Sequence, residues 1–456
     1  MTLSPQHIQA FEKIVGGENI STDPATLSAY SYDSTRAEIL PSCVLFPRHS
    51  QDLQEIISYA YTHHIPLTPR GAGSGMSGGS INTGVILALQ KHMNKILHID
   101  TQNLCVTLEP AVLNASLNLA LAPHNLFFPP DPASASFSTI GGNISENAGG
   151  MCAVKHGVSK DYLLSAKLVI GTGEMIELGH KTYKDVAGYN LLGLLCGSEG
   201  TLGVITELTL KLKAKARFEK SLLVGFSSLR DLADCSCAIL SGGITPCAME
   251  FLDTLTTQAL NTRFNLYPTE AKAILIIKLD GNFEPSLEYE ASEIGKICKA
   301  YAPLSFEVAK DRSEEERIWF GRKNASQANT LYGVKKLNED ITLPRSKVAD
   351  FLEEVQKVSQ KYSFPIPCFG HIGDGNIHTN VMLPTLEALD EGKEAVKELF
   401  SIALSMGGTL SGEHGIGLSK APYMPLAFSQ THLELFAQIK KTFDPHNILN
   451  PCKMGF

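Results

Sequence analysis

Two histidines and a Glu-His pair in the second half of the chain have the types and spacing of a metal site. His371 and His378 bracket a segment containing Gly-Asp-Gly-Asn, whose glycines should turn the chain so that the two imidazoles converge. Glu413 and His414 are adjacent in SGEHGIG, where flanking glycines let neighbouring side chains point into one site. Two imidazoles and one carboxylate suit a divalent cation with open positions for a substrate. Ordinary hydrogen-bonded histidines, among the 14 of the chain, are the alternative.

A second feature is the glycine run PRGAGSGMSGGS at residues 69–80. Gly73, Gly75 and Gly78 fit the dinucleotide pattern G-x-G-x-x-G, and Asp100 follows as an apparent ribose acid. A Rossmann loop, however, opens directly into a helix, whereas the residues after this run predict a turn and then a strand, VILAL. A flexible surface turn is a further alternative. The pattern favours a non-Rossmann loop whose backbone N–H groups hold a phosphate.

Two more regions rich in small residues follow, at residues 127–163 and in GSEGTLG at 197–203. The first contains Pro-Pro-Asp-Pro, which fixes an extended path, and two Gly-Gly pairs that permit close approach to a ligand. Three such loops between residues 69 and 203 can wrap one long ligand.

Bulk composition limits the function. The 456 residues predict two or three domains, and 43% hydrophobic with 19% charged residues indicates a folded globular protein. The net charge of −8 disfavours nucleic acid as a partner. We expect no transmembrane segment, no signal peptide and a cytoplasmic location. None of the ten cysteines forms a CxxC pair, so structural zinc and a resident iron–sulfur cluster are not expected.

The elements that would position these residues fall into two parts. A helix at 4–16 begins after Ser4 and ends at Gly16-Gly17, and strand–helix–strand and hairpin patterns follow. The composition changes near residue 215. We expect an α+β protein with one domain at 1–215, its core at about 38–215, and a second at 216–456. The segment from about 431 to 456 should return to the first domain.

Six motifs in this order resemble those of a known family. PRGAGSGMSGG, STIGGNISENAGG and KDVAGYNLLGLLCGSEGTLGVITE resemble the FAD-binding domain of the vanillyl-alcohol oxidase superfamily. FGHIGDGNIHTNV, SGEHGIG and FDPHNILNPCKM resemble its D-2-hydroxyacid dehydrogenase branch, which includes glycolate oxidase flavoprotein subunits and D-lactate dehydrogenases. The resemblance implies an FAD-binding α+β domain and a ferredoxin-like α/β substrate (cap) domain.

The resemblance also implies which residues bind non-covalent FAD. No histidine for a covalent tether lies in the first loop, and Cys152 and His156 are weak candidates in the second. The implied cofactor-binding residues are Arg70, Gly71, Ala72, Gly73, Ser74, Gly75, Ser77, Gly78, Gly79, Asp131, Ser138, Thr139, Gly142, Asn143, Ala148, Gly149, Gly203, Ile205 and Asn450.

For the reaction, the resemblance implies oxidation of a small D-2-hydroxy acid, glycolate or D-lactate, to the 2-oxo acid. His371, His378 and Glu413 match metal ligands for Zn, Mn or Fe, and His414 matches the base. The α-hydrogen would leave as hydride to flavin N5. Arg322 would bind the substrate carboxylate, with Ser326 one helical turn on. Asn380, which would share a strand face with His378, is a further candidate substrate residue. Lys335 and Lys336 do not stand where relatives that take dicarboxylates have a lysine.

Several alternatives stay open. D-2-hydroxyglutarate is a rival substrate, and a non-redox alkyl-transfer flavoprotein of the same fold is a rival function. A nicotinamide-linked dehydrogenase is disfavoured because no helix follows the first loop. The electron acceptor is not evident, so a partner subunit with an iron–sulfur cluster, or peripheral membrane association through a partner, is compatible with the sequence.

Overall fold

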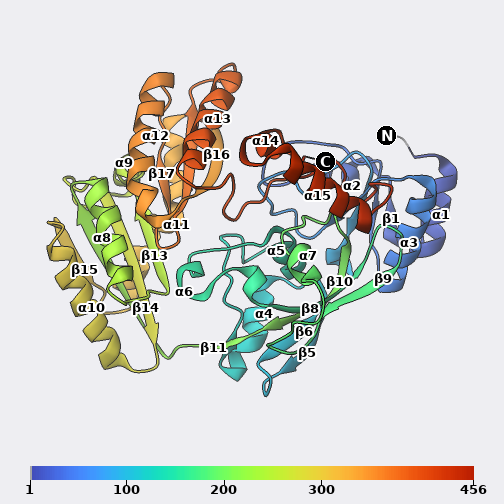
Figure 1. The fold of residues 1–456 in the computed structure, drawn as a ribbon, viewed down its shortest axis with the longest axis horizontal. Helices are drawn as coiled ribbons and strands as arrows, with labels where there is room; N and C mark the ends of the chain where they lie inside the picture. Colours follow the sequence, from blue (N-terminus) through green and yellow to red (C-terminus); the bar gives the residue numbers. More distant parts are fainter. Residues whose placement is uncertain (1–2, 456) are drawn as a thin grey trace. The chain divides into compact units, whose positions relative to one another are not determined.

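The computed structural model describes residues 3–455 and divides the chain into two compact units. Unit 1 contains residues 1–149, 158–215 and 413–456, and unit 2 contains residues 150–157 and 216–412. The last segment of unit 1 thus begins at Glu413, whereas the sequence-based boundary had it near residue 431. Figure 1 shows the elements of both units in chain order, with the C-terminal helices in red.

Unit 1 is built on two sheets. A four-stranded sheet has the order β1-β2-β4-β3, a five-stranded sheet the order β5-β6-β10-β8-β9, and β7 pairs with β11. The strands are β1 Ile20–Ser21, β2 Cys43–Leu45, β3 Leu67–Arg70, β4 Val85–Ala88, β5 Ile96–Asp100, β6 Cys105–Leu108, β7 Leu126–Phe127, β8 Leu163–Val169, β9 Met175–Gly179, β10 Val204–Lys211 and β11 Lys213–Ala214. The helices are α1 Pro5–Val15, α2 Pro24–Ala29, α3 Ser50–His63, α4 Asn114–Leu121, α5 Ile140–Glu146, α7 Leu191–Leu195, α14 Met424–Ala427 and α15 Gln430–Phe443.

The glycine loop of unit 1 runs between two parallel strands. β3 and β4 pair in parallel, with Leu67 opposite Val85, and the loop joins them without a helix. The strand that the sequence predicts after the loop is therefore confirmed, and a Rossmann arrangement is excluded by the same observation. Asp100 ends β5, and its carboxylate accepts from the backbone N–H groups of Gln102 and Asn103, so it serves a turn.

The C-terminal segment completes the core of unit 1. Ile448 and Leu449 are buried with residues of α1, α3 and the four-stranded sheet. The N–H of Leu67 donates to the carbonyl oxygen of Ile448, and the N–H of Asn450 donates to that of Leu67. Residues nearly 400 positions apart along the chain are in this way held beside β3.

Unit 2 is a seven-stranded sheet covered by helices. The strand order is β15-β12-β14-β13-β17-β18-β16, and every neighbouring pair is antiparallel. The strands are β12 Phe218–Phe226, β13 Ala248–Leu252, β14 Ala273–Gly281, β15 Ser305–Val308, β16 Lys335–Thr342, β17 Cys368–His371 and β18 Asn376–Leu383. The helices are α6 Ala153–His156, α8 Leu229–Ser241, α9 Thr254–Phe264, α10 Glu284–Lys299, α11 Arg312–Ala328, α12 Val348–Tyr362 and α13 Leu389–Ser405.

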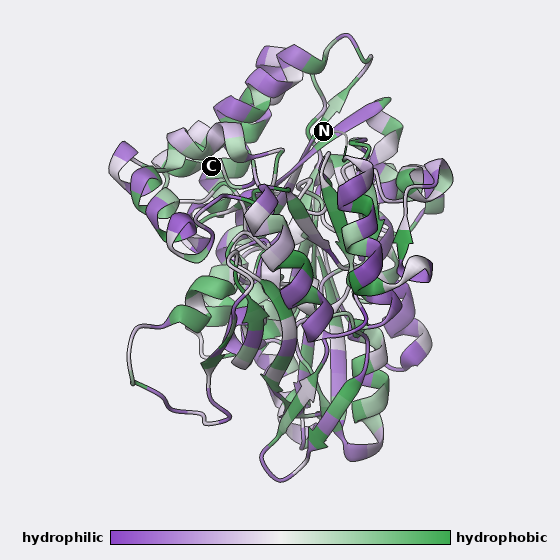
Figure 2. Cartoon of the chain, turned by 90° about the vertical axis from the view of Figure 1, so that its right-hand side faces the viewer, coloured by the Kyte–Doolittle hydropathy of each residue, from purple (hydrophilic) through white to green (hydrophobic). Residues whose placement is uncertain are grey.

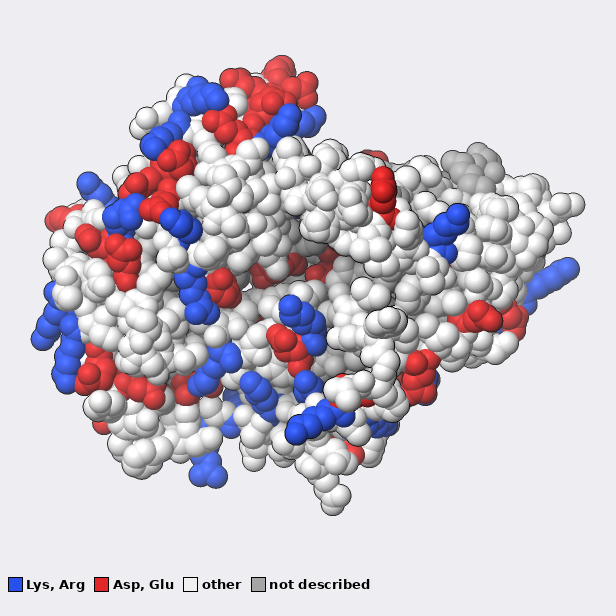
Figure 3. Space-filling model, viewed as in Figure 1, with Lys and Arg blue, Asp and Glu red and all other residues white. Residues whose placement is uncertain are grey.

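Burial of hydrophobic residues holds the helices and strands of each unit together. In Figure 2 the strands are mostly hydrophobic, while many helices carry hydrophilic residues on one side. In unit 2, α9 and α11 pack on the sheet through a core that includes Leu260, Ile318, Trp319 and Phe369. Figure 3 shows acidic side chains gathered around α13. The first turn of this helix contains Asp390 and Glu391, and negative charges at that end stabilise a helix. Among the described helices, none is long and apolar enough to cross a membrane.

Candidate functional site

The three small-residue loops line a cavity of about 320 Å³ in unit 1. The glycine loop, the region around α5 and the loop before β10 all contribute, as the sequence predicts for one long ligand. Of the implied cofactor residues, those in the wall are Arg70, Gly71, Ala72, Gly73, Ser74, Gly75, Gly79, Thr139, Gly142, Asn143, Ala148, Gly203 and Ile205. The others, which lie outside the wall, are Ser77, Gly78, Asp131, Ser138, Gly149 and Asn450.

The glycine loop has unpaired N–H groups, whereas several of its carbonyl oxygens are hydrogen-bonded within the protein. The oxygen of Gly75 accepts from the N–H of Ser34, and the oxygen of Gly79 accepts from the Asn450 side chain. Among the described residues, the N–H groups from Gly71 to Gly75 form no hydrogen bond. Unpaired N–H groups beside a cavity are costly unless an anion or water meets them. The loop is thus suited to the diphosphate of a dinucleotide.

Arg70 supports this loop from behind. Its guanidinium donates to the carbonyl oxygens of Tyr32 and Ser80 and lies over the ring of Tyr30, 5.3 Å from the centroid. Gly73 has φ +68°, and a Cβ there would collide with this guanidinium. Burial lowers the pKa of Arg70 from its usual value. The side chain therefore stiffens the loop, while the Arg70 backbone begins it.

The region around α5 is more regular than its composition indicates. Thr139 caps α5, and its hydroxyl accepts from the N–H of Gly142. A Cβ on Gly141 would lie 2.6 Å from the Cβ of Pro110, so this glycine serves packing within the protein. Cys152 and His156, the weak tether candidates, belong to unit 2 and lie outside the cavity wall.

Two acids in the cavity wall, the half-buried Glu146 and the buried Glu199, were not predicted from the sequence. Glu146 ends α5, and Glu199 precedes β10 in GSEGTLG. Glu199 accepts from the N–H groups of Ile416 and Gly417, over 2.6 and 2.7 Å. Burial raises the pKa of both carboxyls, and the charge of Glu199 raises that of Glu146 further. The only sequence signal was a lone acid within each small-residue stretch.

The SGEHGIG turn belongs to the same cavity. Glu413 and His414 both line it, from the segment that begins the last part of unit 1. Gly415 and Gly417 have φ of +81° and +51°, conformations that favour glycine. At the C-terminal side of this turn, the N–H groups of Ile416 and Gly417 donate to the carboxylate of Glu199. The residue that the resemblance matches to a base thus lies in the wall of the same cavity as the glycine loop.

In unit 2, a buried carboxylate holds two of the predicted site residues. Glu250 on β13 is fully buried and stands opposite His371 across the β13–β17 ladder. The Nδ1–H of His371 donates to Glu250 Oε1 over 2.7 Å, and the Nε of Arg322 donates to Oε2 over 2.5 Å. Arg322 also lies over the ring of Phe369 at 5.0 Å. With its proton on Nδ1, His371 carries its lone pair on Nε2, the nitrogen that can ligate a metal.

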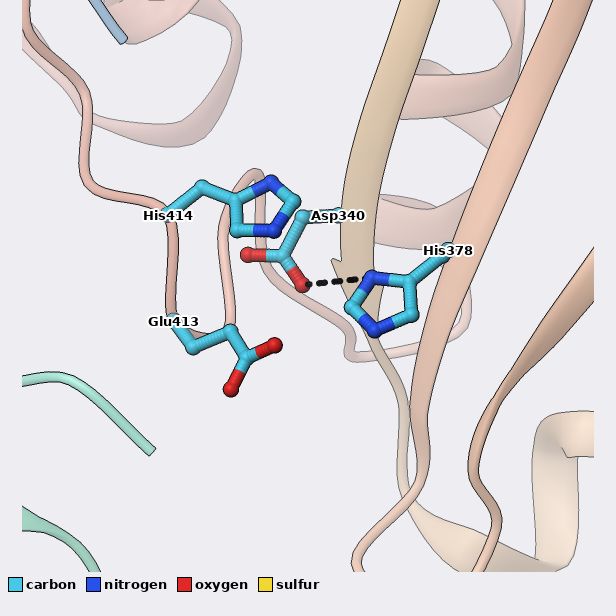
Figure 4. Close-up of side chains that lie close together, drawn as sticks. All are labelled: Asp340, His378, Glu413 and His414. Carbon is cyan, nitrogen blue, oxygen red and sulfur yellow. Dashed lines mark ion pairs between the residues drawn. The ribbon is translucent and has the colours of Figure 1, made fainter. Parts of the chain in front are cut away.

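A second carboxylate faces His378. Asp340 on β16 pairs with His378 on β18, with Oδ1 and Nδ1 3.8 Å apart, as the dashed line in Figure 4 shows. Asp340 also accepts from the Asn376 side chain, the Ser411 hydroxyl and the N–H of Gly412. The chain then continues directly into Glu413 and His414. Asp340 and Glu250 could not be identified from the sequence, because only the strand register places them beside histidines.

Two predicted substrate residues, Ser326 and Asn380, form hydrogen bonds within the protein. The hydroxyl of Ser326 accepts from the Lys336 ammonium over 2.7 Å at an exposed position. Asn380 is fully buried, and its amide donates to the carbonyl oxygens of Pro367 and His378. These contacts fit a structural role for both side chains, and Arg322 is the predicted substrate residue with a guanidinium near the histidines.

Comparison with protein families identifies the class. Residues 41–179 match the family model described as FAD binding domain, and residues 215–454 match that described as FAD linked oxidases, C-terminal domain. The chain belongs to the FAD-linked oxidases, in the D-2-hydroxyacid dehydrogenase branch of the vanillyl-alcohol oxidase superfamily. It is an FAD-dependent hydroxyacid oxidoreductase.

The chain is also similar to particular proteins of this class. The chain is 37% identical to glycolate oxidase subunit GlcD of Bacillus subtilis, covering 97% of this chain and 95% of that protein. It is 33% identical to glycolate oxidase subunit GlcD of Escherichia coli, covering 97% and 89%. It is 32% identical to D-lactate dehydrogenase of Anaerostipes hadrus, covering 100% and 98%.

Solved structures show the same fold. p-Cresol methylhydroxylase with substrate bound superposes with a TM-score of 0.80 at 17% identity, covering 99% of this chain and 96% of that chain. The 4-ethylphenol oxidase from Gulosibacter chungangensis gives 0.79 at 18%, covering 99% and 98%. The predicted two-domain, vanillyl-alcohol-oxidase-type α+β fold is confirmed.

Proposed function

We propose that the protein oxidises glycolate or D-lactate to the corresponding 2-oxo acid. The carrying observation is that His414 lies in the wall of the cavity that the glycine loop also lines. A base in that wall can reach a substrate beside the cofactor. Relatives named glycolate oxidase subunit and D-lactate dehydrogenase support these two substrates.

FAD fits the cavity because its glycine loop presents N–H groups without protein acceptors. When bound, FAD supplies a two-electron acceptor for the α-hydrogen and its bonding pair. The residues of this chain do the remaining work. His414 takes the proton of the substrate hydroxyl, and Arg322 binds the carboxylate with the guanidinium nitrogens that Glu250 does not engage.

A divalent metal would lower the pKa of the substrate hydroxyl. The resemblance implies His371, His378 and Glu413 as its ligands. Within unit 2, His378 and Asp340, both drawn in Figure 4, supply an imidazole and a carboxylate, and the chain runs from Gly412 directly into Glu413. Asp340 accepts three hydrogen bonds from the chain, which suits orienting a ligand better than binding the metal.

We also propose that electrons leave to a partner subunit. The support is that two of the relatives are named as subunits of glycolate oxidase. Co-expression with neighbouring gene products, followed by gel filtration, tests this. A complex that passes electrons to a dye faster than the single chain supports the proposal, and equal rates contradict it.

The central experiment is anaerobic reduction. Purified FAD-bound protein is mixed with D- and L-lactate, glycolate and D-2-hydroxyglutarate, each with and without a chelator, and the visible flavin band is followed. We expect bleaching by glycolate or D-lactate that the chelator suppresses. Bleaching by none of these acids would remove the proposed function, and bleaching by D-2-hydroxyglutarate alone would replace the substrate. An alkyl-transfer flavoprotein would give no bleaching with any of them.

A further inference from the structure

Glu146, a half-buried acid that the proposed reaction does not use, lies against the glycine loop. Glu146 lines the cavity, and its Oε1 is 3.0 Å from where a Cβ on Gly79 would stand and 3.8 Å from that on Gly75. Its Oε2 is buried against Gly415 and has no hydrogen-bond partner among the described residues. The carboxyl group is thus held between the glycine loop and the SGEHGIG turn, with unused hydrogen-bonding capacity.

The charged neighbours decide which of the two acids is ionised. The groups that act on Glu146 are the carboxylates of Glu199 and Asp33 and the ammonium of Lys420, and His414 lines the same cavity. Glu199 accepts hydrogen bonds from two backbone N–H groups, and the charges of Lys453 and Lys420 also stabilise its ionised form. Glu146 has no such donors, and burial holds its pKa well above the usual range. The surroundings therefore favour the ionised form more at Glu199 and the protonated form more at Glu146.

The ligand of the glycine loop makes this difference useful. A diphosphate diester carries two negative charges throughout the neutral range, and an ionised carboxylate beside it would repel it. A neutral carboxylic acid has an O–H that donates to a phosphate oxygen. We propose that Glu146 binds the FAD diphosphate as a neutral carboxylic acid, and that loss of its proton weakens FAD binding. The inference concerns the cofactor and goes beyond the proposed substrate chemistry.

FAD affinity measured without substrate tests it. Apoprotein is titrated with FAD by quenching of flavin fluorescence between pH 6 and pH 9, for the wild type, Glu146→Gln and Glu146→Ala. Glu177→Gln, an exposed acid on β9 of the same unit, is the matched control. Because no substrate is present, failure of this proposal leaves the oxidation of hydroxy acids untouched, and the reverse also holds.

We expect the wild type and Glu177→Gln to lose affinity as the pH rises, because a neutral donor becomes a repelling charge. Glu146→Gln keeps an N–H donor, so it should bind within about threefold of the wild type at pH 6 and lack the decline. Glu146→Ala should bind about tenfold or more weakly at pH 6, the value of a hydrogen bond to a charged group, and also lack the decline. Unchanged affinity of Glu146→Ala at pH 6 would overturn the proposal. If Glu146→Ala does not fold, a decline in Glu146→Gln equal to that of the wild type would overturn it.

Discussion

The backbone N–H of Leu418 donates to the carbonyl oxygen of Ser77 over 2.8 Å. The N–H of Ser419 donates to the same oxygen over 3.0 Å. Ser77 belongs to the glycine loop, and Leu418 follows the SGEHGIG turn that contains His414. Within unit 1, the loop that suits the diphosphate and the turn that carries the proposed base are therefore parts of one hydrogen-bonded structure. A change that opens this contact should affect both functions.

Gly417→Ala tests the contact between loop and turn. Gly417 has φ +51°, and a Cβ there would lie 2.2 Å from the carbonyl oxygen of Ser77. We expect a loss of about 2 kcal/mol or more in the free energy of unfolding, together with reduced FAD occupancy. Gly188→Ala is the control, because Gly188 has φ +88° with nothing within 4 Å. Its cost should be about 1 kcal/mol, from backbone strain alone. Equal melting temperatures for the two variants would contradict the steric argument.

His414→Ala tests the proposed base. Removing the imidazole leaves the glycine loop intact, so FAD should stay bound while the substrate hydroxyl has no group to take its proton. We expect the rate of anaerobic bleaching to fall by about 100-fold or more, with the flavin absorbance of the purified protein unchanged. His432→Ala, which removes an exposed histidine of α15, should bleach at the wild-type rate. Retained reduction in His414→Ala would remove the assignment.

The sequence alone was sufficient to predict those features that depend on local backbone conformation. The spacing of Gly71 to Gly79, followed by a strand, predicts a phosphate loop outside the Rossmann fold, and the parallel pairing of β3 with β4 confirms the strand after the loop. Glycine requirements are local properties of φ and of close approach, so composition reveals them.

The acids of the site could not be predicted in this way. Glu250 faces a histidine 121 positions later and Asp340 one 38 positions later, through the register of antiparallel strands. Nothing in the residues around either acid specifies that register. Likewise, the pKa values of Glu146 and Glu199 are raised only because folding removes water from both carboxyl groups. Glu199 also accepts hydrogen bonds from a turn 217 residues away.

Arg322→Lys tests the substrate-binding fork. Glu250 engages the Nε of Arg322, and the terminal nitrogens of the guanidinium form the fork that suits a carboxylate. A lysine ammonium cannot bind Glu250 and hold a carboxylate bidentately at once. We expect KM for the hydroxy acid to rise about 10- to 100-fold, with kcat reduced less. Arg317 lies on the same helix as Arg322 and forms an exposed ion pair with Glu307 of β15, so Arg317→Lys should leave KM within about twofold. A fall in kcat with KM unchanged would contradict the assignment.

Asp340→Asn tests how the metal ligands are oriented. Asparagine has one acceptor oxygen where Asp340 uses both carboxylate oxygens to hold Asn376, Ser411 and Gly412. The segment leading to Glu413 should loosen, and His378 should lose its carboxylate partner. We expect metal content and kcat to fall together by about 10- to 100-fold. Asp390→Asn, at an exposed position paired with Lys393, should change neither. Full metal content in Asp340→Asn would show that Asp340 does not act through the metal site.

Asp253 makes the stability of unit 2 depend on pH. It caps α9 by accepting from the N–H of Thr256, and its other oxygen accepts from the N–H of Cys368. Burial raises its pKa to about 6, so between about pH 4 and pH 6 the folded state binds more protons than the unfolded state. Stability must then fall as the pH rises through this window, by at most about 3 kcal/mol. Asparagine resembles the protonated acid at every pH. We therefore expect Asp253→Asn to gain stability relative to the wild type between pH 4 and pH 7, measured by urea unfolding at each pH. A constant difference across that range would show that the carboxyl titrates near its ordinary pKa.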